Sequence, residues 1–123
     1  MPWQLDHVQL AIPPGAEGRC DEFYVTLLGF HALEKPPVLA ARGGRWYRNG
    51  AVTLHLGVED DFRPAKKAHP ALSLDDYEPL LARLNGAGIE VRDDQSIPGT
   101  TRCYVEDPVG NRLELIDAST LHS

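Results

Sequence analysis

The sequence EDPVGNRLELI, residues 106–116, places a tight turn between two predicted strands. Its central proline, glycine and asparagine favour a reversal of the chain. The flanking strands are predicted over residues 101–106 and 112–117. Side chains alternate between the two faces of a strand, so Leu113 and Leu115 share one face and Glu114 lies on the other. We therefore expect Glu114 to lie opposite the apolar core.

The pattern upstream of this stretch predicts another strand, a helix and a further strand. Apolar and polar residues alternate over residues 69–74, which is typical of a half-buried strand. Apolar residues then recur at helical spacing over residues 77–84, after Asp75 or Asp76 as a helix cap. Residues 89–92 form the next predicted strand. The second half of the chain therefore has the order β-α-β-β-β.

The first half of the chain repeats this order. The predicted elements are a strand over residues 7–12, a helix at Cys20–Leu28 and strands at Phe30–Glu34, Arg45–Arg48 and Val52–Val58. Gly29 ends the helix. Asn49-Gly50 predicts a hairpin between the last two strands, because both residues accept positive φ.

The spacing of matching residues indicates an internal duplication. Gly29 precedes His55 by 55 − 29 = 26 positions, and Gly88 precedes Glu114 by 114 − 88 = 26 positions. Two diverged copies of a module of about 50 residues explain this agreement. We place module one at about residues 4–58 and module two at about 68–117, inside a single domain that spans residues 1–123.

Length and charge exclude several classes of function. The chain has 123 residues, of which 12 are Lys or Arg and 18 are Asp or Glu, so its net charge is −6. That balance argues against nucleic acid or an anionic membrane surface as a partner, because both need a basic face. The sequence also lacks a secretory signal and a membrane-spanning apolar run, which predicts a cytoplasmic protein with its two cysteines reduced.

The duplication places four side chains that can bind a metal at equivalent positions. His7 and His69 are expected on the first strand of each module, and His55 and Glu114 on the last. A single histidine on a strand is more often an ordinary exposed side chain than a ligand, but four at repeat-equivalent positions favour a shared site. Three imidazoles and one carboxylate suit one divalent ion of Zn, Ni, Co, Fe or Mn.

These motifs resemble those of the vicinal oxygen chelate superfamily, which includes glyoxalase I, fosfomycin-modifying enzymes, extradiol dioxygenases and bleomycin-binding proteins. The matching segments are LDHV (5–8), FYxxLLGF (23–30), AHPAL (68–72) and the opening stretch (106–116). The resemblance implies an α+β fold of two tandem βαβββ modules that form a cup-shaped, partly open sheet around a metal or ligand. It also implies a homodimer in which module one of one chain and module two of the other build each cup.

The resemblance carries metal ligation over to His7, His69 and Glu114. His55 departs from the glyoxalase I pattern, in which a carboxylate or amide-type ligand also helps proton transfer. We expect His55 to be a fourth ligand or a base, so that Glu114 and His55 are the catalytic candidates. The candidates for substrate binding on the same faces are Gln9, Trp46, Arg48 and Arg112.

Two functions are consistent with the resemblance. The first is a metal-dependent, glyoxalase-like enzyme that acts on a small oxygen-chelating substrate by lyase, isomerase or dioxygenase chemistry. The alternative is a metal-free, antibiotic-sequestering protein of the bleomycin-resistance type, whose cup holds an apolar or cationic ligand against Trp46. One scaffold hosts both, so the fold does not choose between them.

Overall fold

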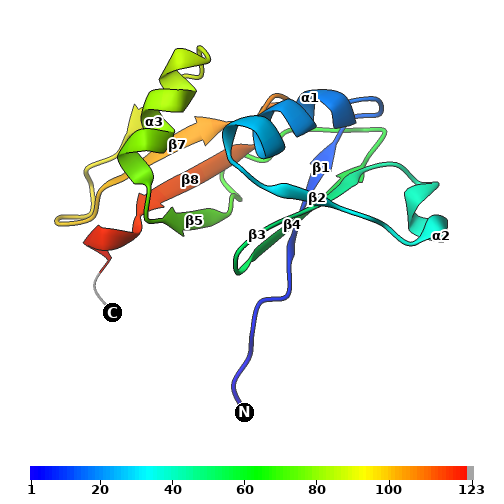
Figure 1. Ribbon diagram of the computed structural model, residues 1–123, viewed down its shortest axis with the longest axis horizontal. Helices are drawn as coiled ribbons and strands as arrows, with labels where there is room; N and C mark the ends of the chain where they lie inside the picture. The colour runs from blue at the N-terminus through cyan, green and yellow to red at the C-terminus, as the bar shows by residue number, and fades with distance from the viewer. Residues whose placement is uncertain (122–123) are drawn as a thin grey trace. The chain divides into compact units, whose positions relative to one another are not determined.

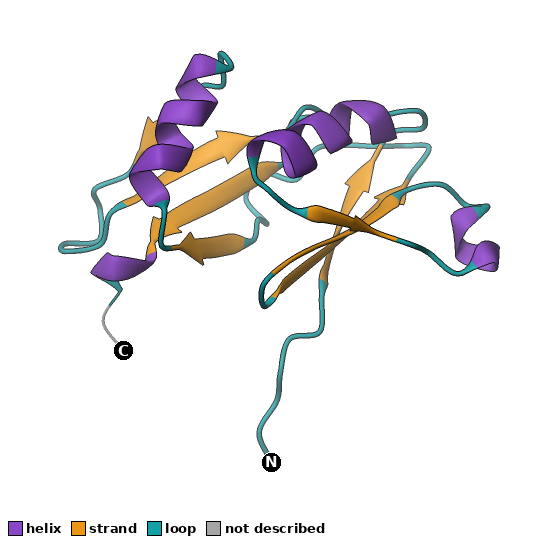
Figure 2. Ribbon diagram, in the orientation of Figure 1, coloured by secondary structure: helices purple, strands orange, loops and turns teal. Residues whose placement is uncertain are grey.

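The computed structural model describes residues 1–121, in two compact units (Figure 1). Unit 1 covers Met1–Pro64, and unit 2 begins at Ala65. Each unit contains one four-stranded sheet and its own helices (Figure 2). Over residues 1–121, none of the helices has both the length and the apolar character that crossing a membrane requires.

Unit 1 folds as a mixed sheet with the strand order β1-β4-β3-β2. Its elements are β1 (Val8–Ile12), α1 (Glu17–Asp21), the π-helix η1 (Glu22–Leu27), β2 (His31–Leu33), α2 (Pro37–Ala40), β3 (Arg45–Asn49) and β4 (Val52–Val58). β1 pairs with β4 in parallel, and the other pairs are antiparallel. The apolar face of the sheet packs against η1, where the rings of Tyr24 and Tyr47 stack at 5.3 Å.

Unit 2 repeats this topology with the strand order β5-β8-β7-β6. Its elements are β5 (Ala71–Leu74), α3 (Tyr77–Gly86), β6 (Arg92–Asp93), β7 (Arg102–Glu106), β8 (Arg112–Asp117) and the 3-10 helix η2 (Ala118–Thr120). β5 pairs with β8 in parallel. Leu80 and Leu84 of α3 are buried, as are Leu113 and Leu115 of β8, so the helix and the sheet share one apolar core.

The shared strand order confirms the predicted α+β fold with two βαβββ modules. The cup that the two sheets are expected to form stays a prediction. One local expectation was wrong. The strand predicted at 89–92 is β6 at Arg92–Asp93, because the chain leaves α3 through Gly88 with φ +78° and Ile89 still donates to Leu84 O. The segment between β2 and β3 also contains the short helix α2, which begins at Pro37 because proline is well suited to the first turn of a helix.

The turn that opens β8 is held by two buried side chains. Asp107 accepts hydrogen bonds from the backbone N–H groups of Val109 at 3.0 Å and Asn111 at 2.9 Å. Asn111, which is 1% exposed, accepts the Ala65 N–H through Oδ1 at 2.9 Å. These buried side chains hold the turn in one conformation through their hydrogen bonds. The turn therefore determines where β8 begins and hence where Glu114 lies.

We expect Asn111→Ala to lower the free energy of unfolding by about 1–3 kcal/mol, because the part-buried Ala65 N–H loses its acceptor and the buried Asn111 side chain is removed. Urea unfolding followed by circular dichroism measures the loss. Asn85→Ala is the matched control, since Asn85 is an exposed residue of α3; its effect should stay within about 0.5 kcal/mol. Equal losses in the two variants would contradict the proposed role of Asn111.

Candidate functional site

Three aromatic rings stack on the polar face of the unit 1 sheet. β4 places His55 there, between the buried Leu54 and Leu56 of the opposite face. The ring of His7 lies 3.9 Å from that of His55 with an interplanar angle of 18°. The ring of Trp46, the cross-strand partner of His55 on β3, lies 4.4 Å away at 10°. We call these three residues the ring stack, with His55 in its centre.

The tautomer of His7 is set by its neighbour. Nδ1 of His7 lies 2.8 Å from Oδ2 of Asp6. The hydrogen bond from His7 holds the pKa of Asp6 below its ordinary value, so the carboxylate is an acceptor and Nδ1 of His7 carries the proton. The neutral ring then keeps its lone pair on Nε2. A carboxylate behind a histidine is the usual support of a metal-binding imidazole.

His55 is kept neutral by its surroundings. Burial lowers its pKa, and the neighbouring His7 lowers it further. A neutral imidazole has a lone pair that is free to bind a metal ion or to accept a proton. The chemistry expected of His55, as a ligand or as a base, is therefore available to it in unit 1.

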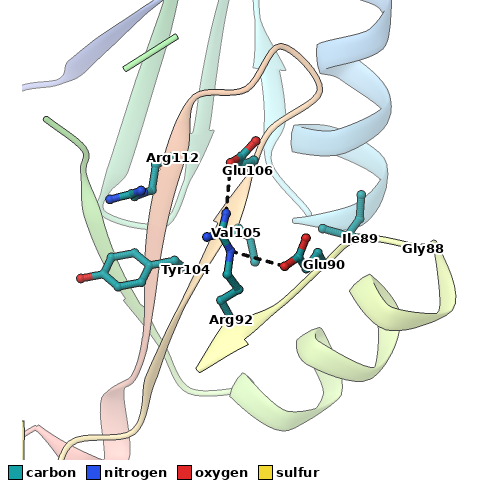
Figure 3. Close-up of a pocket in the computed structure, with 8 residues that line it drawn as sticks. All are labelled: Gly88, Ile89, Glu90, Arg92, Tyr104, Val105, Glu106 and Arg112. Atoms are coloured by element: carbon teal, nitrogen blue, oxygen red, sulfur yellow. Dashed lines mark hydrogen bonds and ion pairs between the residues drawn. The ribbon is translucent and has the colours of Figure 1, made fainter. Parts of the chain in front are cut away.

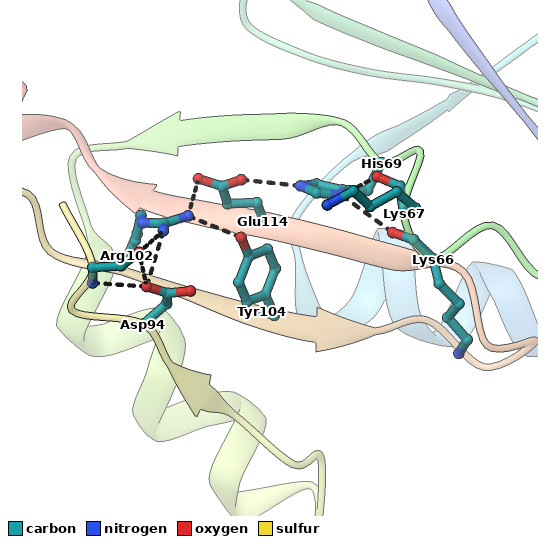
Figure 4. A network of polar contacts seen from close by, with 8 residues as sticks. Lys66, Lys67, His69, Asp94, Arg102, Tyr104 and Glu114 are labelled. Carbon is teal, nitrogen blue, oxygen red and sulfur yellow. Dashed lines mark hydrogen bonds and ion pairs between the residues drawn. The ribbon is translucent and has the colours of Figure 1, made fainter.

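In unit 2 a second polar group surrounds Glu114 (Figure 4). Oε1 of Glu114 lies 3.0 Å from Nε2 of His69, and Oε2 accepts a hydrogen bond from Arg102 Nη1 at 3.0 Å. Arg102 also donates to the Tyr104 hydroxyl at 2.9 Å and pairs with Asp94 at 2.9 Å. We call these five residues the carboxylate cluster. The side chain of Glu114 is only 12% exposed, so Arg102 balances a charge that solvent barely reaches.

His69 faces Glu114 in a way that calls for a cation. Its Nδ1 lies 3.0 Å from Lys67 O and 3.2 Å from Lys66 O. Carbonyl oxygens only accept, so Nδ1 carries the proton and the lone pair of the neutral ring is on Nε2. That lone pair then meets a carboxylate oxygen 3.0 Å away, and two acceptors at that distance repel each other unless a proton or a metal ion lies between them.

The two histidines expected on first strands lie just before them. His7 precedes β1, which begins at Val8, and His69 precedes β5, which begins at Ala71. The expectation was wrong because the alternation of polar and apolar residues starts before the strand does. Pairing with the neighbouring strand begins only at Val8 in β1 and at Ala71 in β5. Leaving the strand frees His69 to turn its Nδ1 toward the backbone of the preceding loop.

The predicted substrate-binding residues of unit 1 share the face of the ring stack. Gln9 pairs with His55 in the parallel register, and its amide lies over Gly57, where a Cβ would come within 2.6 Å of Gln9 Nε2 and push the amide aside. Arg48 is exposed and lies 3.5 Å from the Thr53 hydroxyl through Nε. Both flank the ring stack, as the alternation of the strands predicts.

Arg112 lines a pocket of about 240 Å³ in unit 2 (Figure 3). Its guanidinium lies over the Tyr104 ring, 5.3 Å from the centroid. Arg92, on the same pocket, pairs with Glu106 at 3.4 Å and Glu90 at 3.5 Å. Among the described residues 1–121, no carboxylate forms an ion pair with Arg112. Its donors thus remain available to an anionic ligand.

Sequence reasoning missed Arg102, Tyr104 and Asp94. The signal for two of them was present in β7, where Arg102 and Tyr104 alternate with the buried Cys103 and Val105 and so share the face of Glu114. The internal repeat did not help to find Arg102. Trp46 pairs with His55 as Tyr104 pairs with Glu114, so the residue two positions before Trp46, which is Gly44, is the counterpart of Arg102. An arginine has no side-chain equivalent there.

Each unit by itself supplies two of the four predicted metal ligands. Over residues 1–121, neither unit alone gathers three or more His, Cys, Asp or Glu side chains that could hold a metal ion. Unit 1 contributes His7 and His55, and unit 2 contributes His69 and Glu114.

A model of the Glyoxalase/Bleomycin resistance protein/Dioxygenase superfamily matches residues 4–115. The chain belongs to this superfamily. One similar structure is that of a glyoxalase family protein from Bacillus anthracis. Its sequence is 41% identical to the sequence of this chain, and the TM-score is 0.90 over 94% of this chain and 95% of that one. TnmS3, an antibiotic binding protein from a Streptomyces species, is 25% identical, with a TM-score of 0.67 over 94% and 98% of the two chains.

A third similar structure is the lactoylglutathione lyase of Agrobacterium tumefaciens. It is 16% identical, with a TM-score of 0.73 over 99% of this chain and 98% of that one, so the likeness concerns the fold. No curated protein sequence matches the chain significantly. Superfamily membership confirms the predicted resemblance.

Proposed function

We propose that the chain is a divalent-metal-dependent enzyme that binds a small substrate through two neighbouring oxygens. The proposed ligands are His7, His69 and Glu114, with His55 as a fourth ligand or as a base. The observation that carries the proposal is the facing pair in unit 2, where Nε2 of His69 and Oε1 of Glu114 are 3.0 Å apart with Nδ1 of His69 already committed to backbone carbonyls.

The donor set fits a transition-metal ion. The distance between Nε2 of His69 and Oε1 of Glu114 is 3.0 Å. Imidazole nitrogen with carboxylate oxygen suits Zn, Ni, Co, Fe or Mn better than Ca or Mg. Asp6 behind His7 supports the same conclusion, because it leaves Nε2 of that ring free.

A bound ion of this kind would act as a Lewis acid toward the oxygens of the substrate. Around it, the neutral His55 is suited to take or return a proton, since its low pKa keeps a lone pair available near neutral pH. Trp46 holds the His55 ring in one orientation by stacking on it. These roles support lyase, isomerase or dioxygenase chemistry and do not choose among them.

The substrate that this arrangement favours carries a negative charge. Within residues 1–121, no carboxylate pairs with the Arg112 guanidinium above Tyr104, and Tyr104 is the cross-strand partner of Glu114. An anionic group at Arg112 would thus lie beside the metal ligand on the same face of the sheet. Gln9, Arg48 and Trp46 are the proposed contacts from unit 1.

The second candidate function is metal-free binding of a small molecule, which two observations favour. Trp46 presents a ring held flat against His55, a suitable surface for a planar ligand. TnmS3, at 25% identity, is an antibiotic binding protein. For either function we propose a homodimer in which each site draws on both chains.

Metal content tests the first proposal. We expect wild-type protein, purified without chelator and dialysed, to retain about one transition-metal ion per chain, measured by plasma mass spectrometry. The variant His69→Ala combined with Glu114→Ala should retain almost none, because only His7 and His55 remain. His31→Ala is the matched control, since His31 is exposed on β2, and it should behave like wild type. Equal metal in wild type and the double variant would contradict the proposal and favour the metal-free alternative.

A further inference from the structure

Arg102 is a buried arginine whose two terminal nitrogens, Nη1 and Nη2, both have partners around Glu114. It is 7% exposed and lies between Glu114 and Asp94 (Figure 4). Nη1 donates to Glu114 Oε2 at 3.0 Å and to the Tyr104 hydroxyl at 2.9 Å. Nη2 pairs with Asp94 Oδ1 at 2.9 Å and donates to Ser96 Oγ at 2.8 Å. The planar guanidinium is thus held at both Nη1 and Nη2.

This arrangement divides the two oxygens of Glu114. Oε2 is occupied by Arg102, while Oε1 faces Nε2 of His69 at 3.0 Å. A metal ion that bound both oxygens would have to break the hydrogen bond between Arg102 and Glu114 Oε2. A hydrogen bond between a guanidinium and a carboxylate is among the stronger ones in proteins. We infer that Arg102 is a positioning residue that makes Glu114 a one-oxygen ligand through Oε1, an inference that rests on the proposed metal site.

Asp94 and Ser96 make Arg102 rigid enough for this role. The Ser96 hydroxyl and N–H both bond to Asp94 Oδ1, at 2.5 Å and 2.8 Å. These hydrogen bonds hold the pKa of Asp94 below its ordinary value, so it stays ionised opposite Arg102. The loop between β6 and β7 therefore acts on Glu114 from outside the ligand set. Unit 1 has no arginine at the equivalent position, because Gly44 takes the place of Arg102 there.

A carboxylate that offers one oxygen beside an imidazole suits compact transition-metal sites, where each metal bond is about 2.0–2.2 Å long. Outer residues that orient metal ligands typically change metal affinity 10- to 100-fold when they are replaced. Arg102 should therefore control both the affinity of the site and the coordination of the ion.

Co²⁺ titration of the full chain tests this role, because visible absorption reports the coordination of bound Co²⁺. We expect Arg102→Lys, which keeps the charge and loses the fork, to weaken Co²⁺ binding by about 10- to 100-fold and to change the absorption spectrum. Arg45→Lys is the matched control: Arg45 makes a similar forked pair with Asp21 in unit 1, and its replacement should leave affinity within about twofold and the spectrum unchanged.

Asp94→Asn provides a second variant in which Arg102 and Glu114 both remain. It should weaken Co²⁺ binding at least about threefold with a smaller spectral change, and it decides the matter if Arg102→Lys does not fold. Wild-type protein that binds no Co²⁺ would overturn the proposed function and this inference together. Wild-type binding combined with unchanged affinity and spectrum in the folded variants would overturn this inference alone.

Discussion

Saturating Co²⁺ should raise the melting temperature of the metal-free protein by about 12–20 °C. A ligand that binds only the folded state, present at about 1,000 times its Kd, adds about 4 kcal/mol to the free energy of unfolding. For a domain of this size, each kcal/mol corresponds to about 3–5 °C. The unfolded chain does not hold the proposed ligands together, so the ion would bind the folded protein and stabilise it.

Differential scanning calorimetry with and without Co²⁺ measures the shift, and chelator should reverse it. In the variant His69→Ala combined with Glu114→Ala, Co²⁺ should leave the melting temperature within about 1 °C, because two ligands and the facing pair are gone. Mg²⁺ is the control ion for the wild-type protein, since imidazole ligands suit it poorly. A similar Co²⁺ shift in wild type and the double variant would rule out the proposed ligands.

Gly44→Ala should lower the free energy of unfolding by about 3 kcal/mol or more. Gly44 has φ +85°, and a Cβ built there would lie 2.1 Å from the carbonyl oxygen of Leu56. That atom belongs to the backbone of β4, so relief requires the strand itself to move. Arg45, the next residue, pairs with Leu56 in the ladder that carries Trp46 and His55, and the ring stack should loosen as well.

Gly50→Ala is the matched control for this substitution. Gly50, in the turn between β3 and β4, also has positive φ, at +57°, but a Cβ there meets nothing within 4 Å. It should lose only about 1 kcal/mol, the cost of the left-handed conformation. Urea unfolding of both variants separates backbone crowding from conformational strain. Equal losses would show that the approach to Leu56 contributes nothing.

The order of elements was predictable because each signal is local. The turn 107–111, the helix stop at Gly29 and the alternation of β4 and β8 all depend on residues within a few positions of one another. The faces of His55 and Glu114 followed from that alternation, and the register confirms them. α2 and the displaced β6 were not predictable in the same way, because proline and glycine mark a change of direction but do not specify the next element.

The sequence by itself thus determined the duplicated topology and the face on which each candidate ligand lies. Only the tertiary structure decided how those side chains meet. The contact of His69 with Glu114 joins residues 45 positions apart, and Arg102 reaches Glu114 across 12. Such contacts depend on strand register and side-chain rotamers, which no local pattern encodes. The separate partners of the two Glu114 oxygens, His69 at Oε1 and Arg102 at Oε2, are consequences of that long-range packing.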